Sequence, residues 1–243
     1  MAKKIRLERL LANLGYGSRK DVSRAIKDGA LVINGEPVFD SSLQIDPAEL
    51  STATFDGDPV DPVSPLTILL HKPRGYTCSS DEQGLLVYDL LPPRWKKRDP
   101  ILSTAGRLDK DSTGLVLMTD DGQLLHKIIS PKIHVQKHYR VTLRDSLKGD
   151  EATLFASGTF CLKNDNKPLK PAFWHPESER SGVMILQEGR YHQIRRMFAA
   201  VGNHVETLHR FKLGGLELDV LAEGQHIVLK DDDVLRIFSE RNA

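Results

Sequence analysis

The chain has few cysteines and no long apolar run. These two features argue against a disulfide-rich protein and against a membrane-spanning protein. Cys78 and Cys161 are the only cysteines among 243 residues, too few for a disulfide framework or a Cys-based zinc site. No segment approaches the ~20 apolar residues of a membrane-spanning helix, and no apolar stretch follows the N-terminal lysines as in a secretory signal. We therefore expect a cytoplasmic protein without a membrane partner.

Several catalytic signatures are also missing. The sequence contains no phosphate-binding Gly-x-x-x-x-Gly-Lys loop, no dinucleotide fingerprint, no nucleophile elbow and no His-Glu-x-x-His pair. His134 and His138 do not predict a metal site, because His138 begins a strand pattern rather than a helical face. Asp109 and Asp111 could be a divalent-metal pair, but no third carboxylate lies near them in sequence. We expect neither a metal nor a cofactor.

Positive charge is concentrated at the N-terminus, although the whole chain is balanced at 34 Lys and Arg against 33 Asp and Glu. Apolar residues at helical spacing predict a helix over residues 5–14, which the following glycines end. Ser18 and Asp21 predict the capped start of a second helix that closes at Gly29, and Asn34-Gly35 predicts a tight hairpin. A basic face on such a unit suits a phosphate backbone, although an ordinary solvated face is an equal alternative on charge alone.

Residues 55–65 hold three prolines and no strand or helix period. They predict a linker, which we place at residues 59–65. Beyond it, strands are expected at 66–70, 76–79, 115–118, 139–143, 159–162, 170–174, 183–186, 205–210 and 227–229, and helices at 85–91, 124–129, 150–157, 191–201 and 232–238. Because strands outnumber helices without regular alternation, we expect an α+β fold with a mainly antiparallel or mixed sheet.

In the stretch Gly106 to Asp121, a loop dense in charge runs into the apolar strand expected at 115–118. A strand of this kind can hold a catalytic group in place at its end. On its own the loop is more typical of a solvated turn with an Arg/Asp pair. Its motif becomes informative only together with others, namely Lys72-Pro-Arg-Gly75, Gly106-Arg-Leu-Asp109, Lys137-His-Tyr139 and the segment Glu188 to Met197.

Taken in order, these motifs resemble those of the pseudouridine synthases, in the RsuA branch, and the likeness spans essentially the whole chain. Residues 3 to about 50 resemble the small RNA-binding domain named for ribosomal protein S-four. The resemblance implies an S-four-like domain at 1–58, the linker at 59–65 and a catalytic domain of the pseudouridine synthase type at 66–243. It also implies that the basic N-terminal face binds RNA through Arg6, Arg9, Ser18, Arg19, Lys20, Arg24 and Lys27.

The same resemblance implies a set of residues for the reaction. Asp109 would be the catalytic carboxylate and Arg195 its cationic partner, while Tyr139 would stack on the uracil and help to remove the C5 proton. Whether Asp109 attacks C1′ or C6 of the uridine, or removes a sugar proton, stays open. Binding roles fall to Arg107, which would fill the gap left by a flipped base, and to Leu108, Ile194 and Lys72.

We therefore expect an isomerase, an rRNA pseudouridine synthase that modifies one uridine of small-subunit (16S) ribosomal RNA, free or in an assembly intermediate, and that works as a monomer. One alternative is a synthase of the same branch acting on large-subunit rRNA. Another is a non-catalytic RNA-binding assembly factor, which would have no need of Asp109, Tyr139 and Arg195 together. A nuclease or N-glycosidase would alter the length of the RNA or remove a base.

Overall fold

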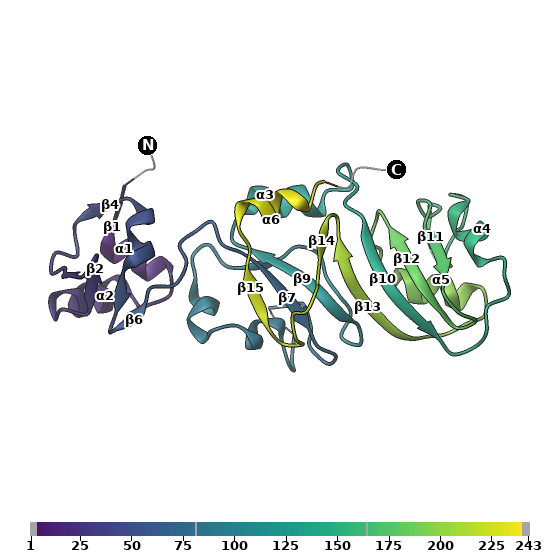
Figure 1. Cartoon of the computed structure of the whole chain (residues 1–243), viewed down its shortest axis with the longest axis horizontal. Helices are drawn as coiled ribbons and strands as arrows, with labels where there is room; N and C mark the ends of the chain where they lie inside the picture. The colour runs from purple at the N-terminus through teal and green to yellow at the C-terminus, as the bar shows by residue number, and fades with distance from the viewer. Residues whose placement is uncertain (1–3, 81, 164, 240–243) are drawn as a thin grey trace. The chain divides into compact units, whose positions relative to one another are not determined.

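A computed structural model of the chain describes residues 4–80, 82–163 and 165–239 (Figure 1). The chain forms two compact units. The N-terminal unit comprises Met1–Leu66 with Leu91–Ser103 and Thr119–Gly122, and the C-terminal unit comprises Thr67–Leu90, Thr104–Met118 and Gln123–Ala243. Across the described ranges, no helix has the length and apolar character needed to cross a membrane.

The N-terminal unit consists of two short helices and small sheets. Its elements are β1 (Ile5–Arg6), α1 (Leu7–Asn13), α2 (Arg19–Lys27), β2 (Leu31–Ile33), β3 (Glu36–Pro37), β4 (Gln44–Ile45), η1 (Pro47–Thr52), β5 (Thr54–Phe55) and β6 (Asp58–Pro59). Both predicted helices and the hairpin are confirmed. Ser18 caps α2 in a reciprocal box with Asp21, and Asn34 and Gly35 have the positive φ of a type I′ turn.

The sequence predicted no strand in residues 55–65, and this prediction is wrong. β5 and β6 pair antiparallel around Asp56-Gly57, whose φ angles are 51° and 85°. Asp-Gly is itself a strong type I′ hairpin signal, and the prolines that follow it obscured that signal. Pro59 is tolerated because β6 is an edge strand in the order β3-β2-β5-β6.

Apolar burial explains why the basic residues of this unit face outward. The leucines of α1 pack against Val22 and Ile26 of α2 and against Leu31 of β2, all with side chains less than a tenth exposed. A short amphipathic helix gains most of its stability from such packing rather than from intrinsic propensity. The polar and cationic positions of α1 and α2 are therefore left on the surface.

A nine-stranded sheet is the framework of the C-terminal unit, in the order β11-β12-β10-β13-β9-β7-β15, with β14 on β13 and β8 on β9. The strands are β7 (Thr67–Lys72), β8 (Ser103–Thr104), β9 (Thr113–Thr119), β10 (Lys137–Leu143), β11 (Phe173–Pro176), β12 (Ser181–Leu186), β13 (Val205–Leu213), β14 (Leu216–Glu217) and β15 (His226–Val228). The helices of this unit are η2 (Val87–Leu90), α3 (Gly122–Ile129), α4 (Glu151–Ala156), α5 (Gln193–Ala200) and α6 (Asp231–Arg236), while η3 (Pro93–Lys97) belongs to the N-terminal unit.

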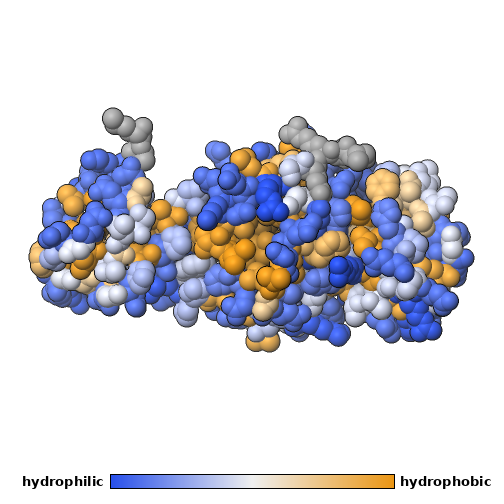
Figure 2. All heavy atoms as spheres, in the orientation of Figure 1, coloured by the Kyte–Doolittle hydropathy of each residue, from blue (hydrophilic) through white to orange (hydrophobic). Residues whose placement is uncertain are grey.

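The α+β class with a mixed sheet is confirmed, since β13 pairs parallel with β9 and antiparallel with β10. β9 is a buried strand from Gly114 to Thr119, as its apolar run predicts. At the sheet edge, Ile227 and Val228 of β15 are nearly half exposed, and Figure 2 shows apolar side chains gathered over this part of the unit.

Two expected strands do not form. Residues 76–79 contribute only an isolated bridge from Thr77 to Leu86. Residues 159–162 form no strand, because Phe160 instead packs edge-on against Phe155 of α4, with ring centroids 5.4 Å apart. The apolar side chains of these two segments pack into the protein, although the backbone there pairs with no strand.

Candidate active site

The loop between β8 and β9 carries Asp109 and is fixed from both sides. The backbone N–H of Ser112 donates to the carbonyl of Asp109 at 3.0 Å, and the N–H of Gly75 donates to the carbonyl of Lys110 at 2.8 Å. The second bond ties the loop to the turn that follows β7. Asp109 is therefore presented by a braced loop at the start of a buried strand.

Lys72, at the end of β7, supports the same loop from inside. It is fully buried, and its ammonium donates to the carbonyls of Pro73, Lys110 and Ser112 at 3.0, 3.3 and 2.6 Å. Burial lowers the pKa of Lys72, while nearby Asp109 and Asp111 act in the opposite direction. With its three donors engaged, Lys72 is better placed to position the loop than to bind a substrate directly.

The carboxylate of Asp109 lies at the first turn of α5. Its Oδ2 is 3.9 Å from Nε of Arg195, and its Oδ1 is 3.5 Å from Nε2 of His192. The side chain of Asp109 is 29 % exposed, so it is shielded and still reachable. The N-terminal end of a helix also carries partial positive charge, so the site is suited to a carboxylate.

The structure thus brings the expected pair Asp109 and Arg195 together, and it adds His192, which the sequence analysis missed. His192 is the N-cap residue of α5 with a left-handed φ of 49°, and it precedes Arg195 by three positions. That i, i+3 spacing on a helical turn was a usable signal.

Arg195 retains an unused donor. Its Nη1 donates to the carbonyl of Val205 at 2.9 Å, while its buried Nη2 has no hydrogen-bond partner among the described residues. Buried polar groups are nearly always satisfied. Because Nη2 is buried, an oxygen atom of a ligand or of water can reach it only after a local movement of the Arg195 side chain.

Tyr139 lies two strands away from the start of β9. It is opposite Arg210 in the pairing of β10 with β13, and Arg210 is opposite Gly114 in the pairing of β13 with β9. Neighbouring strands are about 4.8 Å apart, which puts Tyr139 about 10 Å across the sheet from Gly114. The ring is 8 % exposed.

A buried cation, Arg210, lies between these strands and was not singled out from the sequence. It is 1 % exposed, and its Nε donates to the carbonyl of Leu115 at 2.7 Å. Burial, followed by repulsion from Arg210, lowers the pKa of Lys137 to about 8. Arg210 and Lys137 therefore bring positive charge to the two strands at Tyr139.

The remaining predicted residues of this unit divide into buried and exposed positions. Leu108 and Ile194, the sequence neighbours of Asp109 and Arg195, are buried, with 5 % and 3 % of their surface exposed. Arg107 is 65 % exposed and its Nη2 lies 3.1 Å from Glu82. An exposed ion pair of this kind is weak, so Arg107 can exchange its partner readily.

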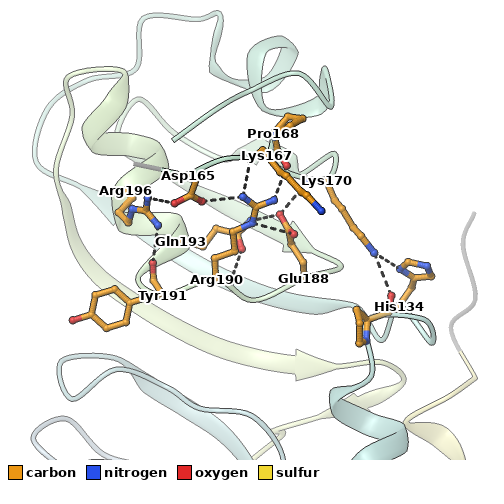
Figure 3. Close-up of polar contacts among 11 residues, drawn as sticks. His134, Asp165, Lys167, Pro168, Lys170, Glu188, Arg190, Tyr191, Gln193 and Arg196 are labelled. Carbon is orange, nitrogen blue, oxygen red and sulfur yellow. Dashed lines mark hydrogen bonds and ion pairs between the residues drawn. The ribbon is translucent and has the colours of Figure 1, made fainter. Parts of the chain in front are cut away.

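The turn that leads into α5 is held by a polar network (Figure 3). The Arg190 guanidinium donates to Asp165 at 2.9 Å, to the carbonyl of Lys167 at 2.8 Å and to Glu188 at 3.3 Å. Asp165 also accepts from Arg196. Hydrogen bonds from Arg196 and then Arg190 lower the pKa of the Asp165 carboxyl. Charge-assisted bonds of this number fix the turn firmly.

The basic residues of the N-terminal unit line two adjoining surface depressions of about 460 Å³ each. Six of the seven expected RNA-binding residues are among the lining residues: Arg6, Arg9, Arg19, Lys20, Arg24 and Lys27. Ser18 is not among them, and its hydroxyl caps α2. In the described ranges, no three His, Cys, Asp or Glu side chains gather as a potential metal site.

Comparison with known proteins gives two family matches. Residues 66–200 match the model described as RNA pseudouridylate synthase, and residues 5–50 match the S4 domain. A solved structure described as the crystal structure of pseudouridylate synthase superposes with a TM-score of 0.67 and 36 % identity, covering 96 % of this chain and 99 % of that one.

Full-length relatives agree with these matches. The chain is 39 % identical over 238 residues to the ribosomal small subunit pseudouridine synthase A of Escherichia coli (strain K12), covering 96 % of this chain and all of the relative. It is 37 % identical over 243 residues to the RNA pseudouridine synthase YtzG of Bacillus subtilis (strain 168), covering 98 % of this chain and all of the relative.

Proposed function

Because this chain belongs to the RNA pseudouridylate synthase family, we propose that it converts a uridine of small-subunit (16S) ribosomal RNA to pseudouridine. The observation that carries the substrate class is the 39 % identity, over nearly the whole of both chains, to a relative named for the ribosomal small subunit. The basic S4 domain supplies the sequence-independent attraction that an RNA substrate requires.

We propose Asp109 as the catalytic carboxylate. The isomerisation breaks the bond between uracil N1 and ribose C1′, forms a bond between C5 and C1′, releases the C5 proton and leaves a proton on N1. Electrons balance without an oxidant or reductant, so the residues need only supply a nucleophile or base and proton transfer. Attack at C1′, attack at C6 and sugar-proton abstraction are all compatible with a shielded carboxylate.

The other residues would position the base and stabilise charge. Arg195 offsets the negative charge of Asp109. Tyr139 would stack on the uracil and assist removal of the C5 proton. Arg107, exposed at the surface, would brace the RNA after the uridine has been flipped out. Lys72 would act through the loop that carries Asp109.

Tritium release from small-subunit rRNA labelled at uridine C5 tests this proposal. The wild-type protein should release tritium, and Asp109→Asn should lose at least about a thousandfold in rate, as is typical when a catalytic group is removed. Asp111→Asn is the matched control, because Asp111 lies in the same loop but is 66 % exposed and faces Arg74.

Each alternative has its own outcome. Normal tritium release by Asp109→Asn would show that Asp109 is not the catalytic carboxylate. Tritium release from large-subunit rRNA alone would identify that RNA as the substrate. Shortened RNA would indicate a nuclease, and a free base would indicate a glycosidase. Binding of rRNA without any tritium release would indicate an assembly factor.

A further inference from the structure

We propose that Tyr191 is a stacking platform for an unpaired RNA base next to the uridine held at Asp109, an inference that rests on the proposed function. Tyr191 is 77 % exposed, the most exposed large aromatic side chain of the described ranges. A single exposed aromatic residue is by itself ordinary. Three further observations distinguish this one.

The first observation is the position of the ring. Tyr191 stacks on the imidazole of His192 with ring centroids 3.9 Å apart and an interplanar angle of 14°. His192 in turn lies 3.5 Å from the Asp109 carboxylate. Asp109, His192 and Tyr191 therefore form a continuous series of contacts, and one face of the tyrosine ring is covered while the other is open.

The second observation is that the backbone beneath Tyr191 is rigid. The carbonyl of Tyr191 accepts from Arg196 at 3.4 Å, and the N–H of Arg190 donates to Gln193 at 2.9 Å. The side chain of Gln193 also donates to Glu188 at 3.2 Å. Figure 3 shows the Tyr191 ring pointing away from the Asp165–Arg190 cluster that anchors the turn.

The third observation is the chemistry of the surroundings. Proteins bind unpaired RNA bases by stacking them on aromatic rings next to cationic groups. A ring already held on a braced turn loses little conformational freedom on binding. Because the base to be modified must leave its stack to reach Asp109, its neighbour also loses a stacking partner, and the open face of Tyr191 can replace that partner.

The test uses the full-length protein and the shortest rRNA fragment that the wild-type protein modifies. Tyr191→Ala should raise KM by roughly 5- to 150-fold, the range for loss of one base–aromatic stack, with a smaller change in kcat. Tyr191→Phe should behave as wild type, because it retains the ring. Phe173→Ala is the control, since Phe173 is 41 % exposed on β11 of the same unit.

A matched change in the RNA makes the test specific. Replacing one nucleotide that flanks the target uridine by an abasic residue should raise KM for the wild type as much as Tyr191→Ala does. The same RNA should cause no further rise with Tyr191→Ala, since both changes remove one contact. Should Tyr191→Ala fail to fold, Tyr191→Leu against Tyr191→Phe gives the same comparison.

Two results would overturn the inference: a KM for Tyr191→Ala within twofold of wild type, or independent effects of the variant and of every flanking abasic site. These results are distinguishable from failure of the proposed function. If the proposed function were wrong, the wild-type protein itself would release no tritium from small-subunit rRNA.

Discussion

Gly114 packs directly against the backbone of Arg210. A Cβ added to Gly114 would lie 2.7 Å from the backbone nitrogen of Arg210 and closer still to its carbonyl oxygen. Gly114 also has a φ of +113°, a conformation that side-chain-bearing residues rarely adopt. The contact lies where β9 pairs with β13, five residues after Asp109, so it sets the point from which the Asp109 loop departs.

Gly114→Ala should therefore destabilise the protein by about 2 kcal/mol or more, because backbone atoms cannot move aside and the φ is strained. Its rate of tritium release should fall as the Asp109 loop shifts. Gly122→Ala is the control, because Gly122 has open space around its Cα and an ordinary φ. Urea unfolding checks the first effect, and equal stabilities of the two variants would contradict it.

Lys72→Met should reduce kcat by tenfold or more while changing KM little, since the loop carbonyls lose their donor but no RNA contact is removed. Leaving such buried acceptors unpaired costs about 1–3 kcal/mol. Lys110→Met is the control, because Lys72 bonds the carbonyl of Lys110 and not its side chain. A KM effect without a kcat effect would instead make Lys72 a substrate-binding residue, as the sequence suggested.

The pKa of Lys137, lowered to about 8 by burial, predicts a pH-dependent stability. Below pH 8 the buried ammonium is charged in the native state at a cost. Between pH 8 and the usual lysine range the unfolded chain binds more protons, so native stability rises with pH. Relative to Lys137→Met, the wild type should gain up to about 3 kcal/mol between pH 7 and pH 10. A pH-independent difference in urea unfolding would contradict this.

The basic face of α1 and α2 should determine the salt dependence of RNA binding. Each lost phosphate contact lowers the slope of log K against log salt by about 0.7 to 0.9. Arg19→Gln together with Lys27→Gln should therefore reduce the slope by up to about 1.8. Arg180→Gln, an exposed change in the C-terminal unit, should leave it unchanged. Filter binding from low to moderate salt measures the slopes.

Arg107→Ala should matter most when the target uridine is paired. If Arg107 braces the flipped-out state, its loss should lower kcat/KM by about tenfold or more on a structured fragment and less on an unstructured one. Glu82→Gln releases Arg107 from its ion pair and should not lower the rate. Equal losses on both RNAs would assign Arg107 to general phosphate binding.

The sequence predicted best what is determined locally. Ser18 with Asp21 and the terminal glycine define α2 without reference to the rest of the chain. The Asp56-Gly57 hairpin was equally local, but the neighbouring prolines favoured a linker. The strand expected at 159–162 does not form for a different reason. An apolar segment forms a strand only if a partner strand lies beside it, and Phe160 packs against Phe155 of α4 instead.

The candidate site shows the same division. Asp109 and Arg195 were expected as a pair from family motifs, because nothing in their spacing dictates contact between a loop and a distant helix. The geometry at His192 depends on a left-handed backbone angle, which His adopts more often than most residues but which the sequence does not assign to a particular position. Lys72 looked like a binding residue in its motif, and only its complete burial indicates another role.

The contacts of Lys72 also bear on how freely the Asp109 loop can change during evolution. All three acceptors of its ammonium are main-chain oxygens, which every amino acid carries. The geometry of the loop is thus largely independent of which side chain stands at the exposed position 110. A saturation library at position 110 should retain many active variants, because Lys110 is exposed, while few replacements should be recovered at Lys72 or at the fully buried Ser112.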